Sequence, residues 1–444
     1  MRRPEKRRER NGFRRRHLSL TLRPYGTIIN MLRMYGAYEN GSPLTPGGMR
    51  AAAVKARQMK KKKAIGVENF VFLACFVAFF AAFGWKMGLM NMINTMINTA
   101  YSLLIETVFY LMAMCVIMGA ISSLFTEFGI ISLFNRLLYP LMRPVYDLPG
   151  AASVGIITTF LSDNPAVLTL ADDKYFRSFF KRYQFPAITN LATAFGMGMI
   201  VCTYMLGLSG LGGGEHFGKA VLIGLLGAVI GSIVSTRLMI AFSAKQYGKD
   251  AWMPEHEEGV DQKKEQLRPV RAGNVANRFL SAILDGGKSG VKMGFEIIPG
   301  VLLICTLVLM MTNSMPEGGY TGAAYEGVAL LPMLAGKVDF ILKPLFGFSS
   351  PEAIGVPITA LGAAGASLTM ARQLVVTSLA GANDIAVFTA MCMCWSGYLS
   401  THVSMMSTIG CTEMTGKALV SHTVGGLVAG ITAHWLFVLV SLIL

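Results

Sequence analysis

A polar interruption in an apolar segment decides the fold: residues 160–173 read FLSDNPAVLTLADD. The residues before it, AASVGIITT at 151–159, would continue readily into hydrocarbon, but Asp163, Asn164 and Pro165 follow at once. Proline removes a backbone donor and breaks a helix, and every backbone polar group in lipid needs a partner. Such a break is tolerated only inside protein or beside a wet cavity. The stretch therefore predicts a helical hairpin that dips towards mid-membrane.

The composition agrees with a membrane protein. The chain has 444 residues, of which 53% are hydrophobic and 15% charged, and its mean hydropathy is +0.50. These values are typical of polytopic membrane proteins and rare in soluble domains. Because the chain lacks the alternating segments of an outer-membrane barrel, its spans are expected to be helical. The predicted fold class is an all-α polytopic membrane protein.

The formal net charge of +15 lies in the N-terminal segment. Residues 1–64 hold 18 of the 40 Lys and Arg but only three acids, so the remainder is neutral overall and no nucleic-acid partner is expected. We interpret residues 1–64 as a basic, solvated cytoplasmic tail, with binding to an anionic membrane surface as an alternative. A third interpretation is that Met59, which opens MKKKKAIGVENFVFL, is the true start.

Apolar runs predict about seven transmembrane helices and two broken stretches. A short loop is expected at 93–100, and amphipathic segments are expected at 128–144, 277–292 and 330–344. The predicted helices are 69–92, 101–124, 185–208, 217–244, 295–311, 385–400 and 417–442, and the broken stretches are 150–171 and 351–370.

An internal repeat relates the two broken stretches. Residues 143–170 align without a gap on residues 343–370, at an offset of 200. Two further pairs of matching segments occur in the same order in both halves, which indicates a true repeat rather than chance matches. They are 104–115 with 294–305, which places Glu106 opposite Glu296, and 218–231 with 416–430.

Lysine and arginine predict the orientation. The basic tail places the N-terminus in the cytoplasm of a multi-pass protein of the inner or plasma membrane. The basic connector 172–184 and the loop 245–275 then also lie inside, so the helix at 101–124 runs inward and its counterpart at 295–311 runs outward. The repeats are therefore predicted to be inverted, with two re-entrant hairpins that enter from opposite sides.

The segment LLYPLMRPVYDLPGAASVGIITTFLSDNPA, residues 137–166, and its second copy resemble the nucleoside-recognition or Gate domain family. The resemblance covers roughly residues 100–444. It implies the membrane core also found in concentrative nucleoside transporters, in ferrous iron transport protein B and in spore maturation proteins. No GxxxxGK[ST] motif is present, so the GTPase domain of the iron transporter is not expected.

This resemblance and the repeat predict five domains. They are the tail 1–64, a first transmembrane helix 65–95, gate repeat 1 at 96–244, a cytoplasmic loop with an amphipathic helix at 245–285, and gate repeat 2 at 286–444.

Paired interrupted segments in inverted halves point to a transporter with a midplane site. The predicted function is a secondary transporter of a small polar solute, nucleoside-like or other, with coupling to H⁺ or Na⁺. The alternative is a non-transporting membrane scaffold of the spore-maturation type. No HExxH or GxSxG motif is present, and the seven cysteines have no metal-site spacing, so no enzyme activity, cofactor or metal is expected. The expected partners are the bilayer and the solute, and a homo-oligomer is compatible with the sequence.

Asp163 and Asn164 are the leading candidates for solute contact, because an ionisable group at membrane depth is a functional hypothesis by default. The alternatives are structural: Asn164 caps a helix, threonines bond back within helices, and Asn383 and Asp384 cap the next helix. The predicted substrate-binding residues are Ser162, Asp163, Asn164, Thr169, Asn190, Thr193, Gly362, Gly365, Ser367 and Thr369. The predicted ion-coupling residues are Glu106, Glu296, Asn383, Asp384 and His402.

Overall fold

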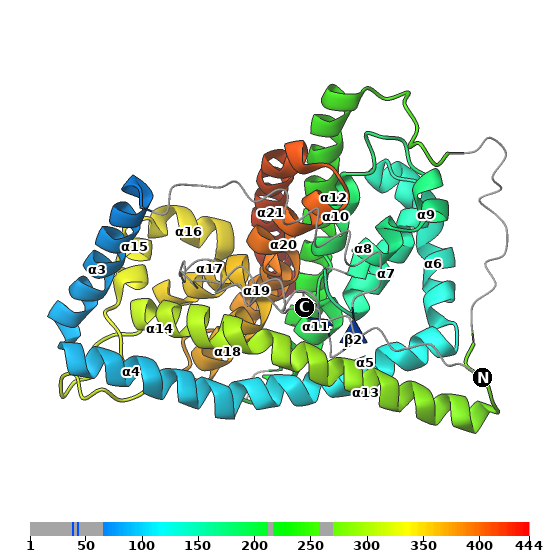
Figure 1. The fold of residues 1–444 in the computed structure, drawn as a ribbon. Coiled ribbons are helices and arrows are strands. Elements are labelled where there is room, and N and C mark those ends of the chain that lie inside the picture. Colours follow the sequence, from blue (N-terminus) through cyan, green and yellow to red (C-terminus); the bar gives the residue numbers. More distant parts are fainter. Residues whose placement is uncertain are drawn as a thin grey trace, which may run out of the picture. The chain divides into compact units, whose positions relative to one another are not determined.

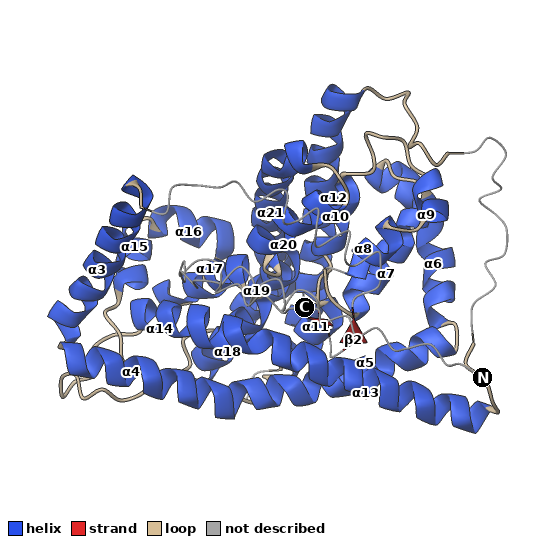
Figure 2. Cartoon of the chain, in the orientation of Figure 1, coloured by secondary structure: helices blue, strands red, loops and turns tan. Residues whose placement is uncertain are grey.

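The computed structural model describes residues 38–39, 42–43, 65–164, 166–211, 216–256 and 270–443. The chain divides into two compact units, Met1–Val77 and Ala78–Leu444. The first contains a two-residue antiparallel ladder of β1 (Tyr38–Glu39) and β2 (Ser42–Pro43), and α3 (Val67–Met87) runs from it into the second. The rest of the predicted basic tail, with Met59, lies outside the described residues. The described part of the second unit is built of helices, and the predicted helical polytopic fold is confirmed (Figure 2).

Two long helices run through the second unit. Leu89–Glu127 is continuous over 39 residues and Val275–Thr312 over 38 residues, so at 1.5 Å per residue each is nearly 60 Å long, about twice the hydrocarbon thickness. Each contains a π-helical segment, Leu103–Val108 in the first and Gly300–Cys305 in the second. In order, the parts are α4 (Leu89–Ser102), η1 (Leu103–Val108), α5 (Phe109–Glu127), α13 (Val275–Pro299), η4 (Gly300–Cys305) and α14 (Thr306–Thr312).

These helices correct two predictions. The loop expected at 93–100 is helical, because the chain turns earlier, at Gly88 with φ 81°. The amphipathic segment 277–292 is not separate but the first part of the second long helix. The proposed domain boundaries at 95/96 and 285/286 therefore fall inside helices.

Glycine allows α5 and α13 to pack closely side by side (Figure 1). A Cβ on Gly286 would lie 2.2 Å from the Gly119 carbonyl oxygen, and one on Gly290 would lie 2.2 Å from the Cys115 carbonyl oxygen. Small residues of this kind let membrane helices approach at backbone distance. At the end of this interface, the buried Glu127 carboxylate pairs with Arg271 at 2.8 Å and Arg278 at 2.7 Å.

The broken stretches each form two short helices in contact with one another. The first breaks at residues 162–164 and the second at Ala363, so the offset of 200 holds at the breaks. The first contains η3 (Gly150–Ala152), α7 (Ser153–Leu161) and α8 (Ala166–Ala171), and the second contains η5 (Pro351–Ile354), α17 (Gly355–Gly362) and α18 (Ala364–Val376).

The helix that follows each pair is itself interrupted, which the sequence interpretation missed. The predicted helix 185–208 is α10 (Ala187–Thr193) and α11 (Gly198–Gly207), and the predicted helix 385–400 is α19 (Ala382–Trp395) followed by α20 (Tyr398–Thr408). Met197 (φ 54°) and Gly397 (φ 67°) both adopt the left-handed conformation, again 200 residues apart.

Two long apolar helices pack on each other and on α19 (Figure 1). They are α12 (Gly218–Tyr247) and α21 (Thr415–Ile443), which match the predicted helices 217–244 and 417–442. Among the described residues, six helices are long and apolar enough to cross a membrane. The predicted seventh, 385–400, falls short because its apolar helix ends at Trp395.

Short helices complete the two repeats. In each repeat two of them occupy a predicted amphipathic segment, 128–144 in the first and 330–344 in the second. Of the other two, one follows the first hairpin and one precedes α21. They are α6 (Ile130–Leu141), η2 (Met142–Tyr146), α9 (Lys174–Ser178), α15 (Leu330–Lys337), α16 (Asp339–Phe346) and η6 (Thr412–Met414).

Glu326 is a buried carboxylate in the loop that joins α14 to α15, with 2% of its surface exposed. It accepts hydrogen bonds from the Thr321 hydroxyl at 2.6 Å, from the Gly322 N–H at 3.1 Å and from the Thr95 hydroxyl of α4 at 3.3 Å. Burial by itself raises the pKa of Glu326, but the bonds from Thr321 and the backbone N–H groups outweigh it, and the net pKa lies below its ordinary value.

We expect the ionised Glu326 carboxylate to stabilise the fold at neutral pH and this stabilisation to vanish in acid. Because the pKa of Glu326 is lower in the folded than in the unfolded state, its carboxylate stabilises the fold fully at pH values above the unfolded pKa of about 4.3. This stabilisation is lost as the pH falls through the folded pKa. The melting temperature of Glu326→Gln should therefore lie well below that of the wild type near pH 7 and approach it in acid. Glu317→Gln, an exposed change in the same loop, is the control. A constant difference across the range would contradict this role of Glu326.

Candidate functional site

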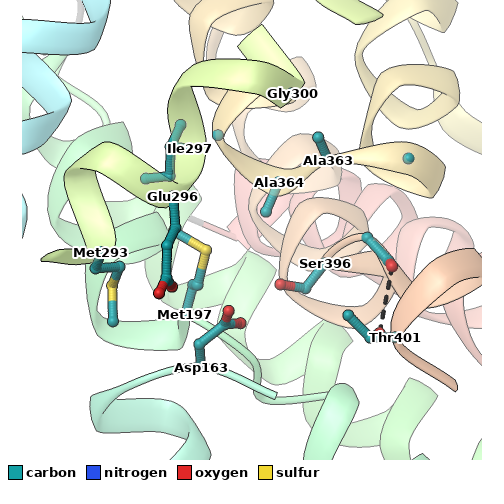
Figure 3. Close-up of a pocket in the computed structure, with 13 residues that line it drawn as sticks. Asp163, Met197, Met293, Glu296, Ile297, Gly300, Ala363, Ala364, Ser396 and Thr401 are labelled. Carbon is teal, nitrogen blue, oxygen red and sulfur yellow. Dashed lines mark hydrogen bonds between the residues drawn. The ribbon is translucent and has the colours of Figure 1, made fainter. Parts of the chain in front are cut away.

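A cavity of about 200 Å³ lies where four helix breaks meet (Figure 3). It draws on both repeats: the tips of the two broken stretches, the interruptions after α10 and α19, and the middle of the second long helix. The lining residues are Asp163, Met197, Met293, Glu296, Ile297, Gly300, Gly362, Ala363, Ala364, Gly365, Ser396, Gly397 and Thr401.

Local backbone conformation creates this cavity. Ala363 is extended (φ −158°, ψ 119°) between α17 and α18, and Gly397 is left-handed between α19 and α20. The Gly397 N–H donates to the Ala360 carbonyl at 2.9 Å, which fixes one break against the other. Chain that leaves the helical conformation presents backbone N–H and C=O groups, and these groups can bind polar ligands at membrane depth.

Asn164 joins the first tip to the second repeat. Its side-chain amide donates to the Ser396 carbonyl oxygen at 2.7 Å, and its backbone N–H donates to the Asp163 carboxylate at 2.7 Å. The Asn164 side chain is fully buried, and neither its Oδ1 nor the Ser396 hydroxyl has a hydrogen-bond partner among the described residues. The Asn164 side chain fits here because residue 196 is glycine: a Cβ on Gly196 would lie 1.5 Å from Asn164 Oδ1.

The charged side chains that line the cavity are both acidic. Figure 3 shows the Asp163 and Glu296 carboxyl groups turned towards the same end of the cavity, beside Met197. Glu296 is 64% exposed and lies 4.0 Å from Lys292, so Lys292 compensates its charge only in part. An arrangement of this kind favours a neutral or cationic ligand with hydrogen-bond donors and disfavours an anion.

Of the predicted site residues, the structure brings Asp163, Glu296, Gly362 and Gly365 to the cavity wall, with Asn164 directly behind them. Others lie elsewhere and hold helices together. Asn190 donates to Ser235 Oγ at 3.0 Å and to the Ala418 carbonyl at 3.1 Å, a link between α10, α12 and α21.

Asn383 and Asp384 act as helix-terminus residues, the alternative that the sequence allowed. The Asp384 carboxylate accepts from the Gly381 N–H at 3.0 Å and the Ser349 N–H at 3.1 Å. Asn383 donates to the Gly347 carbonyl at 2.8 Å and bonds His434 Nδ1 at 2.8 Å. Both residues tie the start of α19 to the end of α16.

Several predicted hydroxyl groups are satisfied locally. Ser162, Ser367 and Thr369 donate to carbonyls three or four residues before them, at 2.6, 2.7 and 3.0 Å. Thr193 is fully buried, and its hydroxyl has no partner within the described segments. The backbone of Thr169 lies in α8, while its side chain is outside the described part of the structure.

Glu106 and His402 do not line the cavity. Glu106 is exposed on η1, so the repeat symmetry that pairs it with Glu296 does not extend to a shared position at the site. His402 is fully buried with its ring centroid 4.6 Å from that of His422, and neither of its ring nitrogens has a partner in the part of the chain described.

The sequence interpretation overlooked Met197, Ser396, Gly397 and Thr401. A signal was present in the glycine pair that flanks Met197, because glycines inside an otherwise helical apolar run mark a possible break. The offset of 200 from Met197 to Gly397 would have strengthened it.

Comparison with known families finds a match within the first repeat. Residues 108–209 match the family model described as Gate, nucleoside recognition. This part of the chain is similar to that family. The matched segment contains Asp163, Asn164, Gly196 and Met197, and so includes two of the four helix breaks that meet at the cavity. No curated protein matches the chain.

Two of the solved structures that are similar to the chain are of CNTnw. CNTnw in an inward-facing substrate-bound state is 11% identical with a TM-score of 0.42, and the alignment covers 88% of this chain and 86% of that one. A double variant of CNTnw in an outward-facing state is 10% identical with a TM-score of 0.42, over 95% and 93% of the chains.

Proposed function

We propose that this protein is a secondary transporter that moves a small polar solute through the cavity between the two hairpin tips. The observation that carries the proposal is that four helix breaks, two from each repeat, meet at one cavity. Discontinuous helices of two inverted repeats that converge at mid-membrane are the typical binding site of secondary transporters. A scaffold has no need for a cavity that exposes acidic and backbone polar groups.

The solute we propose is neutral or cationic and rich in hydrogen-bond donors, with nucleosides as the first class to test. The family model that matches residues 108–209 is described as nucleoside recognition. Ribose hydroxyls can donate hydrogen bonds to the Asp163 and Glu296 carboxylates. Small anions such as carboxylates are expected to bind poorly, because both charged side chains of the cavity wall are acidic.

Coupling to H⁺ or Na⁺ belongs to the same proposal. Asn164 Oδ1 is a buried acceptor without a partner among the described residues, which is costly unless a cation, a water or the solute fills the position. Rocking of one repeat against the other would alternately open this site to the two sides, with the N-terminus in the cytoplasm.

A ligand screen by thermal stabilisation tests the site. Purified protein is heated with nucleosides, amines or carboxylates, each with Na⁺ and at two pH values. We expect a donor-rich neutral or cationic compound to raise the melting temperature of the wild type. In Asp163→Asn the shift should fall to less than a third of the wild-type shift, while Asp172→Asn, an exposed change near the same hairpin, should keep it. An equal shift in both variants would exclude Asp163 from the site.

A further inference from the structure

A second cavity lies apart from the solute site and contains none of its lining residues. Its volume is about 550 Å³, and its walls come from the end of α6, the turn at 147–150, the connector after α9 and Trp252. Two cations, Arg143 and Lys181, line it together with four aromatic rings. The rings are those of Tyr139, Phe179, Tyr183 and Trp252.

Backbone and ring contacts hold these walls in place. The Arg182 N–H donates to the Ala251 carbonyl at 2.8 Å, which brings the Trp252 segment against the connector, and Lys181 Nζ lies 5.5 Å from the Trp252 ring centre. Gln184 donates to the Asp147 carbonyl at 2.7 Å, which fixes the turn on the other side. The cavity is therefore a formed pocket at which two separate segments converge.

The charge of the pocket favours an anion. Arg143 and Lys181 contribute two positive charges and Asp147 one negative charge, which leaves a net positive charge on the walls. Arg177 of the connector is paired with Glu255 at 3.0 Å. Lys174 and Arg182 do not line the pocket, so Arg143 and Lys181 are the cations that face a ligand. Arginine with a nearby lysine is the usual protein partner of a phosphate group, and basic pockets between membrane helices bind lipid headgroups.

The neighbouring surface favours an amphiphile over a free ion. Helix α6 has no buried residue, and its apolar side chains are exposed beside the pocket: Leu137 is 65% exposed and Leu141 49% exposed, while Tyr139 and Pro140 between them line the pocket. A ligand with its phosphate between Arg143 and Lys181 would therefore have an apolar path for chains along α6.

We propose that this pocket binds the headgroup of an anionic phospholipid, with the acyl chains along the exposed face of α6. Site and ligand are independent of the transported solute. Each charge near a membrane surface contributes about fivefold in affinity, so loss of both cations should weaken binding by more than tenfold.

Native mass spectrometry of the purified chain tests the proposal, with phosphatidylglycerol or phosphatidylcholine added in detergent. We expect the wild type to retain phosphatidylglycerol in preference to phosphatidylcholine. The double variant Arg143→Gln/Lys181→Gln should bind phosphatidylglycerol at least tenfold more weakly, and Lys174→Gln, an exposed charge on the same connector, should bind as the wild type does. Circular dichroism checks the fold, and Arg143→Gln alone replaces the double variant if that variant does not fold.

Two results would overturn the proposal. One is equal retention of the two lipids, or equal binding by the wild type and the pocket variants. The other is displacement of phosphatidylglycerol by millimolar inorganic phosphate or glycerol 3-phosphate, which would show that the pocket takes a soluble phosphate compound.

Discussion

Gly286→Ala should destabilise the protein by about 3 kcal/mol or prevent its folding. The new Cβ would lie 2.2 Å from the Gly119 carbonyl oxygen and 2.8 Å from Ala120 Cα. Both are backbone atoms of α5, so no rotamer change relieves the overlap. The long helices would have to separate by about 1 Å, which would cost dispersion contacts along their shared interface.

Gly287→Ala is the matched control, one position along the same helix. Its Cβ would meet only Val116 Cγ1 at 3.6 Å, an ordinary contact, and alanine favours a helix over glycine by nearly 1 kcal/mol. The melting temperature of Gly287→Ala should equal or exceed that of the wild type. Equal melting temperatures for the two alanine variants would contradict close packing of α5 on α13.

Gly196→Ala should weaken binding at the proposed solute site roughly tenfold to hundredfold while the helices remain folded. Its Cβ would occupy the position of Asn164 Oδ1, at 1.5 Å, and would force that side chain out of its bond to the Ser396 carbonyl. The first tip would then lose its tie to the second repeat. Loss of a buried hydrogen bond whose partners stay buried costs about 1–3 kcal/mol. The binding-competent position of the tip would be disfavoured by that amount, so the apparent affinity should fall roughly tenfold to hundredfold.

A double-mutant cycle identifies the cause. Asn164→Ala removes the same bond without any overlap, so Gly196→Ala should add little further loss in the Asn164→Ala background. Gly218→Ala, where a Cβ meets nothing within 4 Å, is the neutral control. If the two losses simply add, as for independent sites, the contact between Gly196 and Asn164 does not explain the effect.

The repeat made much of the fold predictable from the sequence. The offset of 200, found by aligning residues 143–170 with 343–370, predicts the helix breaks at residues 162–164 and at Ala363, because proline and glycine in these stretches of sequence disfavour a continuous helix. The position of Asp163 in the cavity wall could also be predicted from the sequence, since a carboxylate inside an apolar stretch stands out.

The remaining features depend on tertiary contacts that a local pattern does not contain. Met197 adopts a left-handed conformation although methionine has no preference for it, because the surrounding chain holds it there. The amphipathic segment at 277–292 continues into an apolar helix, since it packs through Gly286 and Gly290 on α5 rather than on a membrane surface. Asn190 reads as a candidate ligand in sequence but bonds Ser235 in the structure.

Solute flux into proteoliposomes tests the central claim most directly. The compound that stabilises the protein most is supplied outside vesicles that contain the wild type, Asp163→Asn or Asp172→Asn, with and without a Na⁺ or H⁺ gradient. We predict uptake by the wild type and Asp172→Asn, and a loss of at least tenfold in Asp163→Asn. Binding without uptake by the wild type would show that the cavity belongs to a scaffold or receptor, and uptake unchanged in Asp163→Asn would show that the solute takes another path.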